Sequence, residues 1–254
     1  FGQFVVVQQA VQVDLQAATT ISVYCNTTAA ESVDYTHIQG VNATLYSTTT
    51  TYDAADDNRT HYSNSSCTFI TGGGPSADYQ CAFNLWHFAI NGSWNCTAFA
   101  WNDFVYANET DNATVNPLFA LNISTSIIDY ATLEFSQHSN NVTVNVSNVG
   151  NMPMNVSVYG FGGEDEVAGT GLSMICEINN VSVLFERFAT NTTADYDSKR
   201  QLLSTPQSLG LTIPPKTTPD EIKANSTYWQ FMVPPDSHTF GQCNGSVVFM
   251  AESP

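Results

Sequence analysis

Short stretches in which apolar and polar residues alternate follow one another along most of the chain. Alternation with a period of two is typical of strands with one buried face. Helical periodicity is limited to residues 198–203, just before Pro206. The alternating stretches, which predict an all-β chain, are 11–15, 20–25, 41–46, 95–101, 131–135, 142–147, 154–159, 181–185, 228–233 and 245–250.

The spacing of these stretches predicts two domains. The 254 residues correspond to roughly 1.7 domains of average size. Turn residues at 71–75 and 148–151 separate strands without helices between them, which favours sandwiches. We place the boundary near Asn116-Pro117. We therefore expect two immunoglobulin-like β-sandwich domains in tandem, 11–115 and 116–254, preceded by an N-terminal extension strand, 1–10.

Six cysteines favour a disulfide-bonded protein, although their number alone does not determine the pairing. Four fall in the first predicted domain and two in the second. We favour the pairs Cys25–Cys96, Cys67–Cys81 and Cys176–Cys243. Cys67–Cys81 would close a hairpin, and each of the others would clamp one sandwich. A zinc site built from His61, Cys67, His87 or Cys96 is the alternative, but the chain has no C-x2-C pair.

Tryptophans mark the predicted centre of the first sandwich. Residues 20–25 and 94–101 look like the two disulfide-linked strands of an immunoglobulin-like domain. Trp94 takes the place of the tyrosine whose hydroxyl forms the corner bond of that fold. An indole only donates, so this corner bond is in question. We expect both Trp86 and Trp101 to lie in the core, with Trp86 a candidate to pack on the Cys25–Cys96 bridge.

Charge excludes some classes of partner. Lys and Arg total 6 against 23 Asp and Glu, which gives a net charge of −17. Nucleic-acid binding requires clustered Lys and Arg, and anionic membranes attract the same residues. We therefore expect neither partner.

Acceptor sequons for N-linked glycans are unusually dense. Sixteen of the 23 asparagines stand in Asn-x-Ser/Thr, about three times the number expected by chance. We expect N-linked glycans and an extracellular or cell-surface location, with a signal peptide removed before Phe1. The chain has no run of 18 apolar residues, so we expect no membrane span. The sequon asparagines are Asn26, Asn42, Asn58, Asn64, Asn91, Asn95, Asn108, Asn112, Asn122, Asn141, Asn145, Asn155, Asn180, Asn191, Asn225 and Asn244.

The first ten residues lie outside the predicted sandwich and carry no charge. Phe4, Val5, Val6 and Val7 are consecutive apolar residues, which suits a strand buried on both faces. An exposed strand of this kind aggregates unless it finds a partner. Two partners are open: its own domain, or a groove of a neighbouring subunit, as in donor-strand complementation. We favour the second, with Phe1 and residues 4–7 as the subunit-contacting residues.

Residues 141–160, read with Ile128-Asp-Tyr130, Tyr228-Trp229 and 243–249, resemble the C-terminal domain of secreted archaeal immunoglobulin-like surface proteins. The whole-chain plan is similar to the glycosylated subunits of archaeal extracellular filaments, namely threads and the bundling pili related to the biofilm protein TasA. This resemblance implies a head-to-tail homopolymer held by strand donation. The alternative is a monomeric cell-surface adhesin or carbohydrate-binding module, in which the N-terminal strand pairs within its own domain.

No catalytic motif is present, and we expect no enzyme activity and no cofactor. The five histidines have no nucleophile suggested by position. Two acidic clusters, 53–57 and 164–166, raise the question of calcium. Neither has the spacing of a calcium loop, so we interpret both as solvated loops.

Overall fold

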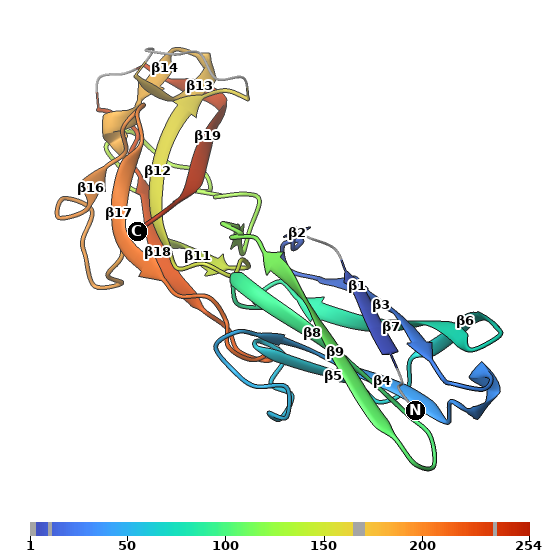
Figure 1. Ribbon diagram of the computed structural model, residues 1–254. Coiled ribbons are helices and arrows are strands. Elements are labelled where there is room, and N and C mark those ends of the chain that lie inside the picture. Colours follow the sequence, from blue (N-terminus) through green and yellow to red (C-terminus); the bar gives the residue numbers. More distant parts are fainter. Residues whose placement is uncertain (1–3, 10–11, 165–170, 236–237) are drawn as a thin grey trace. The chain divides into compact units, whose positions relative to one another are not determined.

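The computed structural model describes residues 4–9, 12–164, 171–235 and 238–254 (Figure 1). The described chain is all-β, with two short 3-10 helices at Tyr35–His37 and Val183–Phe185. It forms two compact units. The first comprises Phe1–Leu118, Val149–Met152 and Pro215–Glu221, and the second comprises Phe119–Asn148, Pro153–Pro214 and Ile222–Pro254.

Two sheets form the first unit, in the strand orders β1-β3-β7-β6 and β2-β9-β8-β4-β5. The first strand is divided between the sheets: β1 is antiparallel to β3, and β2 is parallel to β9. This order is consistent with an immunoglobulin-like sandwich. The strands are β1 (Phe4–Gln9), β2 (Gln12–Val13), β3 (Thr20–Ala30), β4 (Gly40–Ser47), β5 (His61–Asn64), β6 (Thr68–Gly73), β7 (Ser76–Trp86), β8 (Gly92–Trp101) and β9 (Tyr106–Val115).

Two further sheets form the second unit, in the orders β10-β11-β18-β15-β16 and β14-β13-β19-β12-β17. Their inner faces bury Val144, Val156, Phe188 and Trp229. The strands are β10 (Leu121–Ile123), β11 (Val142–Asn148), β12 (Met154–Gly162), β13 (Leu172–Ile178), β14 (Asn180–Ser182), β15 (Glu186–Ala189), β16 (Arg200–Gln201), β17 (Gln207–Ile213), β18 (Ala224–Phe231) and β19 (Phe240–Glu252).

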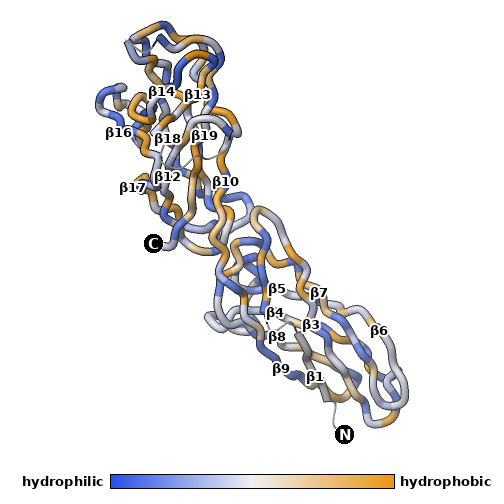
Figure 2. The backbone as a smooth tube through the Cα atoms, turned by 90° about the horizontal axis from the view of Figure 1, so that it is seen from above, coloured by the Kyte–Doolittle hydropathy of each residue, from blue (hydrophilic) through white to orange (hydrophobic). Residues whose placement is uncertain are grey.

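Alternation along the strands produces these two cores. In β3, buried residues recur at every second position from Val23 to Ala29. Hydrophilic and hydrophobic residues are interleaved along both units (Figure 2). The period of two predicted from the sequence is therefore the pleat of half-buried strands.

Some local predictions were wrong. Residues 198–203 hold no helix and contain β16 instead. Residues 131–135 are irregular, not a strand, and Ala131 and Ser136 have positive φ, which interrupts an extended strand. The turn placed at 71–75 begins later, because β6 continues to Gly73 and Gly74 has a φ of +57°.

We predicted the domain boundary between residues 115 and 116. In the structure the chain first passes from one unit to the other between Leu118 and Phe119. Asn151, from the turn predicted at 148–151, belongs to the first unit. Its side-chain amide donates to the carbonyls of Ala89 and Asn116, and its oxygen accepts from the Leu118 amide. A buried asparagine with three backbone partners is a fixed element of the core.

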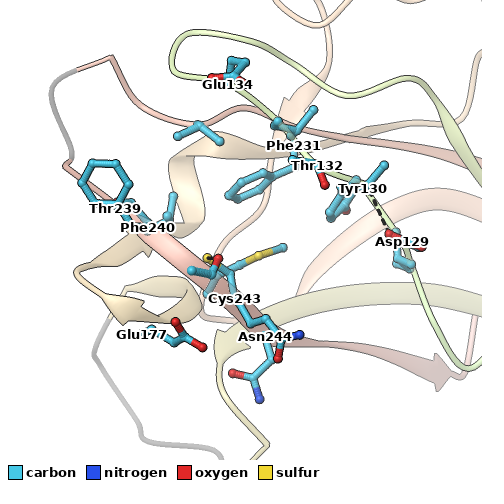
Figure 3. A pocket seen from close by; sticks show the side chains of 18 of the residues that line it. Asp129, Tyr130, Thr132, Glu134, Glu177, Phe231, Thr239, Phe240, Cys243 and Asn244 are labelled. Carbon is cyan, nitrogen blue, oxygen red and sulfur yellow. Dashed lines mark hydrogen bonds between the residues drawn. The ribbon is translucent and has the colours of Figure 1, made fainter.

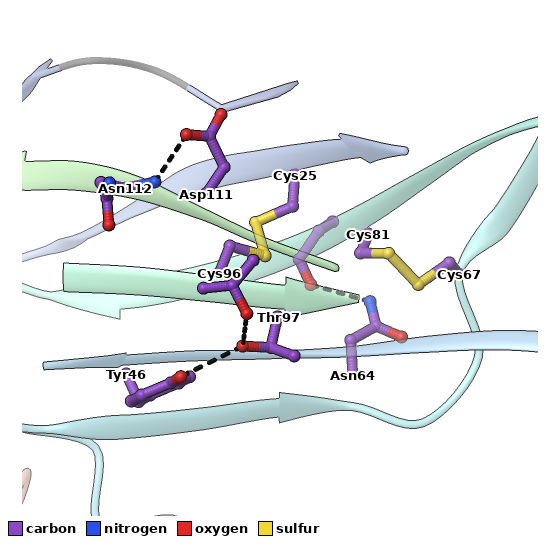
Figure 4. Close-up of a disulfide and its surroundings, with 11 residues drawn as sticks. Cys25, Tyr46, Asn64, Cys67, Cys81, Cys96, Thr97, Asp111 and Asn112 are labelled. Carbon is purple, nitrogen blue, oxygen red and sulfur yellow. Dashed lines mark hydrogen bonds between the residues drawn. A yellow bond between two sulfur atoms is a disulfide. The ribbon is translucent and has the colours of Figure 1, made fainter. Parts of the chain in front are cut away.

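All three predicted disulfides form. Cys25 on β3 and Cys96 on β8 join the two sheets of the first unit, and Cys67–Cys81 closes the β6–β7 hairpin beside it (Figure 4). Cys176 and Cys243 are register partners on the adjacent strands β13 and β19. This third bond therefore links two adjacent strands of one sheet. Our expectation that it clamps the two sheets of the second sandwich was wrong.

Trp94 is the fully buried tryptophan of the first core, and Trp86 is partly buried and packs against the same core. The Trp94 indole N–H donates to the Ile90 carbonyl at 2.8 Å, four residues upstream. The corner bond that seemed in question is thus made by a donor-only ring that reaches a backbone acceptor. Trp86 lies at the end of β7 opposite Thr20, away from the Cys25–Cys96 bridge, and Trp101 is half-buried.

Candidate functional site: the N-terminal strand and the sequon asparagines

The N-terminal strand β1 is antiparallel to β3 over six residues, from the pair Phe4 and Ala30 to the pair Gln9 and Cys25. Of the predicted subunit-contacting residues, Phe4, Val5, Val6 and Val7 belong to this ladder. Phe1 lies outside the described residues. The backbone of β1 is therefore ordered by main-chain hydrogen bonds to a single strand.

The position of β1 closes one side of the first sandwich. It pairs with β3 of one sheet and runs close to β9 of the other. Its register partners Cys25, Thr27 and Ala29 are buried. A strand in this place covers the seam between two sheet edges, and removing it would expose the edge of β3.

Within this chain β1 pairs with its own domain, as the sequence predicts for a monomeric module. The same ladder also defines the register pairs that a strand donated by another subunit would have to form. A neighbour's β1 entering the same slot would form the same six register pairs, because exchange of an identical element preserves every contact. The pairing thus identifies the slot for either arrangement.

All sixteen sequon asparagines are exposed or half-exposed in the structure. The two fully or nearly fully buried asparagines, Asn148 and Asn151, stand outside sequons. An oligosaccharide needs an accessible amide nitrogen and room beside it. Every predicted acceptor residue is at least partly exposed, although the Asn64 Nδ2 donates to the Ala82 carbonyl at 2.9 Å.

Four sequon asparagines share one face of the first unit, the outer face of β4, β8 and β9. Asn95 is the register partner of Asn112, and Phe99 stands between Asn42 and Asn108. The residues between them along the strands, such as Ala43, Cys96 and Ala98, are buried in the core. We call this outer face the sequon face, defined by Asn42, Asn95, Asn108 and Asn112.

The other sheet of the first unit carries one sequon asparagine in β3, Asn26. Its side-chain oxygen accepts a hydrogen bond from the Gln80 amide at 3.0 Å. Other residues on the outward face of β3 include Ser22, Tyr24 and Thr28. Acceptor sites are therefore concentrated on one side of this sandwich.

The second unit contains a cavity of about 1060 Å³ beside the start of β19 (Figure 3). The irregular segment 127–135 forms one wall, and β13 and β19 contribute the other. Apolar side chains, among them Met174, Phe231 and Phe240, line it together with the carboxylates of Asp129, Glu134 and Glu177. Its lining therefore combines apolar and acidic residues, a mixture found in ligand sites.

Under this cavity lies a buried carboxyl group that sequence reasoning missed. The Tyr130 hydroxyl donates to Glu186 Oε1 at 2.7 Å. Burial raises the pKa of Glu186 to about 7, against the lowering effect of the Tyr130 hydrogen bond. Burial first, and then the Glu186 charge, raise the pKa of Tyr130 well above its usual value. No sequence signal marked Glu186, because its partner stands 56 residues away.

The first acidic cluster is engaged in its own loop. Asp57 accepts from the backbone amides of Arg59, Thr60 and His61, and Asp56 accepts from His61 Nδ1 and Ser63 Oγ. The other His61 nitrogen contacts the Tyr52 carbonyl, so this imidazole faces no free nucleophile. Of the second cluster, Glu164 is exposed and residues 165–166 lie outside the described part.

Among the described residues, no group of three or more His, Cys, Asp or Glu side chains is placed to hold a metal ion. In the same part of the chain, no helix has the length and apolar character needed to cross a membrane. The residues suggested for zinc do not converge, since Cys67 and Cys96 are both disulfide-bonded to other cysteines.

Comparison with known proteins identifies no family. No protein-family model matches the chain, and a search of curated proteins also finds no match. Two bacterial macroglobulin structures show weak similarity. Escherichia coli alpha-2-macroglobulin activated by porcine elastase gives a TM-score of 0.34 at 8% identity, covering 99% of this chain and 22% of that one. Salmonella alpha-2-macroglobulin reacted with methylamine gives 0.34 at 7%, covering 97% and 16%.

A DUF4785 family protein from Legionella pneumophila gives a TM-score of 0.30 at 8% identity, covering 99% of this chain and 48% of that one. The chain thus spans about a fifth of the macroglobulins and about half of the Legionella protein. Similarities this weak carry no inference about function.

Proposed function

We propose that the chain is a structural subunit of an N-glycosylated extracellular filament, whose subunits are joined by exchange of β1. The observation that carries this proposal is the attachment of β1 through one edge. It is bonded to β3 alone, by a ladder that a second copy reproduces in every pair. Head-to-tail exchange of such a strand does not close on itself and builds a fibre.

Energetics favour an apolar, backbone-mediated contact. Phe4, Val5, Val6 and Val7 are together worth about 6–12 kcal/mol if fully buried, before chain entropy is subtracted, and this figure is the same whether the slot belongs to the same chain or to a neighbour. Copies with a net charge of −17 repel each other, so charge does not drive the association. The three disulfides and the accessible sequons support an extracellular location.

The competing function is a monomeric adhesin or carbohydrate-binding module. It is favoured by the pairing of β1 with β3 in the same chain. The two functions differ in one measurable respect, namely whether the β1 that lies beside a given β3 comes from the same polypeptide.

A cysteine pair across the ladder tests this difference. Val6 and Thr28 are register partners, and Thr28 is half-exposed. In the Val6→Cys/Thr28→Cys variant, exchange predicts covalent ladders of many subunits on non-reducing gels of purified filaments. Pairing within one chain predicts only monomers. Ser22→Cys/Asn84→Cys, across the internal pair of β3 and β7, is the matched control and stays intramolecular in both cases.

Removal of residues 1–10 and the separate substitution Val5→Asp complete the test. Both variants are expected to abolish filaments in electron micrographs, because the donated strand is lost or carries a charge at the register position opposite the buried Ala29. If both assemble normally, strand donation by this segment is wrong. If filaments need β1 but the cysteine pair never links two chains, the acceptor is not the edge of β3.

A further inference from the structure

An aromatic cluster adjoins one of the acceptor asparagines on the sequon face. Trp101 on β8 is the register partner of both Gly40 on β4 and Tyr106 on β9. The next row on this face is Asn42, Phe99 and Asn108. The Trp101 ring lies across Gly40, where a Cβ atom would collide with it. Two strand positions on, at Asn42, is a sequon asparagine.

Asn42 itself forms part of the wall of a shallow, open surface cavity of about 490 Å³. The other lining residues are Trp101, Asn102, Phe104, Val105 and Tyr106. The depression is largely open to solvent, so a ligand there rests on the aromatic rings and is not enclosed. Asn108, on the other side of Phe99, does not line the cavity.

The apolar side chains of this cavity face water in the protein chain alone. Phe104 is 92% exposed and Tyr106 is 60% exposed. The loop that carries Phe104 is nevertheless held in place. The side-chain oxygen Oδ1 of Asn102 accepts from the backbone amides of Phe104 and Val105 at 2.9 and 2.8 Å. The backbone amide of Asn102 donates to the Val105 carbonyl. The loop is therefore held in one conformation that exposes its aromatic rings to solvent. An exposed apolar surface of this kind is a candidate ligand-binding surface.

We propose that the first sugar residues of a glycan linked to Asn42 occupy this cavity and pack on Trp101, Phe104 and Tyr106. The apolar C–H faces of pyranose rings suit aromatic faces, which are the negative side of the ring quadrupole. The occupant is argued from the attachment point, since Asn42 stands in the cavity wall and its glycan is tethered there at high effective concentration. The inference rests on the glycosylation included in the proposed function, but not on strand exchange.

A folded glycan at Asn42 would act differently from the other glycans of the sequon face. It would cover exposed apolar surface and stabilise the β8–β9 loop, whereas the Asn26 side chain lies on the other sheet and accepts a hydrogen bond from the Gln80 amide. Asn42→Gln and Thr44→Ala remove the Asn42 sequon, and Thr44→Ser retains it. Asn26→Gln and Asn108→Gln are the matched controls.

Hydrogen exchange of the segment 101–106, in the glycoprotein from an N-glycosylating secretory host, tests the proposal. We expect Asn42→Gln and Thr44→Ala to speed this exchange roughly tenfold, with Thr44→Ser and both control variants unchanged. Phe104→Ala should speed it to a similar extent while leaving Asn42 occupied. Adding Asn42→Gln to Phe104→Ala should then have little further effect, because both act through one contact.

Glycopeptide mass spectrometry of each variant measures occupancy independently. The proposal is overturned if Asn42 carries no glycan in the parent protein. It is equally overturned if Asn42 is occupied but its loss leaves the exchange of 101–106 unchanged. Neither result bears on filament formation, which the cysteine pair at Val6 and Thr28 tests separately.

Discussion

The fold strongly alters the chemistry of one carboxyl group, that of Glu186. It is 3% exposed, and its nearest polar partner is the Tyr130 hydroxyl. Burial raises its pKa to about 7 from an ordinary value of 4.5. The carboxyl group is therefore mostly protonated at mildly acidic pH, where it lies neutral in the core of the second unit.

The raised pKa of Glu186 predicts a stability that falls as pH rises. Because the folded pKa exceeds the unfolded value, the contribution is complete below about pH 4.5 and is lost as pH rises through about 7. The full loss is roughly 3 kcal/mol. Glu186→Gln removes this titration. Between pH 5 and 8 the unfolding free energy of the wild type should therefore fall relative to that of the variant.

Chemical denaturation at a series of pH values measures this difference. Glu177→Gln, a change at an exposed carboxylate, is the control and should keep the wild-type slope. A constant difference between Glu186→Gln and wild type from pH 5 to 8 would show that Glu186 does not titrate in this range.

At the scale of elements, the disulfides differ in which strands they join and in how much chain they enclose. Cys67–Cys81 closes a hairpin with a sequence separation of 14, and Cys176–Cys243 joins neighbouring strands with a separation of 67. In the chain-entropy model a longer loop gives a larger restriction of the unfolded state. The position of each bond in a sheet thus matters less for its energy than the length of chain it encloses.

We expect loss of the Cys67–Cys81 bond, in Cys67→Ala/Cys81→Ala, to cost about 3 kcal/mol of unfolding free energy. Loss of Cys176–Cys243, by the corresponding alanine pair, should cost about 4 kcal/mol. Urea unfolding, monitored with a separate spectroscopic signal for each unit, measures both losses of unfolding free energy. Equal losses, or the reverse order, would show that native-state strain or residual unfolded structure outweighs loop length.

The irregular segment 127–135 shows how an element can carry a strand-like pattern without forming a strand. Ile128, Tyr130 and Leu133 contact the core of the second unit. The positive φ at Ala131 breaks the extended backbone. The segment therefore contributes buried side chains and a cavity wall without joining a ladder.

For the whole molecule, the net charge of −17 opposes any association between copies. If subunits join through β1, added salt should speed assembly, because the screening length shortens from about 30 Å at 10 mM to about 8 Å at 150 mM. Light scattering after dilution of dissociated subunits measures the rate, with Val5→Asp, opposite the buried Ala29, as the non-assembling control. Slower assembly at higher salt would mean that opposite charges drive the contact.

Much of the architecture follows from local sequence. Alternation in residues 20–25 and 142–147 predicts strands because side chains i and i+2 of a pleated strand share a face. The same parity places Trp94 with the core cysteine Cys96, and Trp101 with the sequon residue Asn95. Applied consistently, it would have predicted that Trp101 faces outward. Cysteine distribution, sequon density and net charge likewise need no tertiary structure.

Only the tertiary structure decided which strands lie next to each other. Asn42, Phe99 and Asn108 form one row because three strands pair in one register, and no local pattern specifies that register. The environment of Glu186, the acceptor carbonyl for Trp94 and the in-sheet position of Cys176–Cys243 depend on folded neighbours in the same way. Alternation is written in each strand separately, whereas cavities, shifted pKa values and shared faces arise from pairings between distant segments, which the sequence alone leaves open.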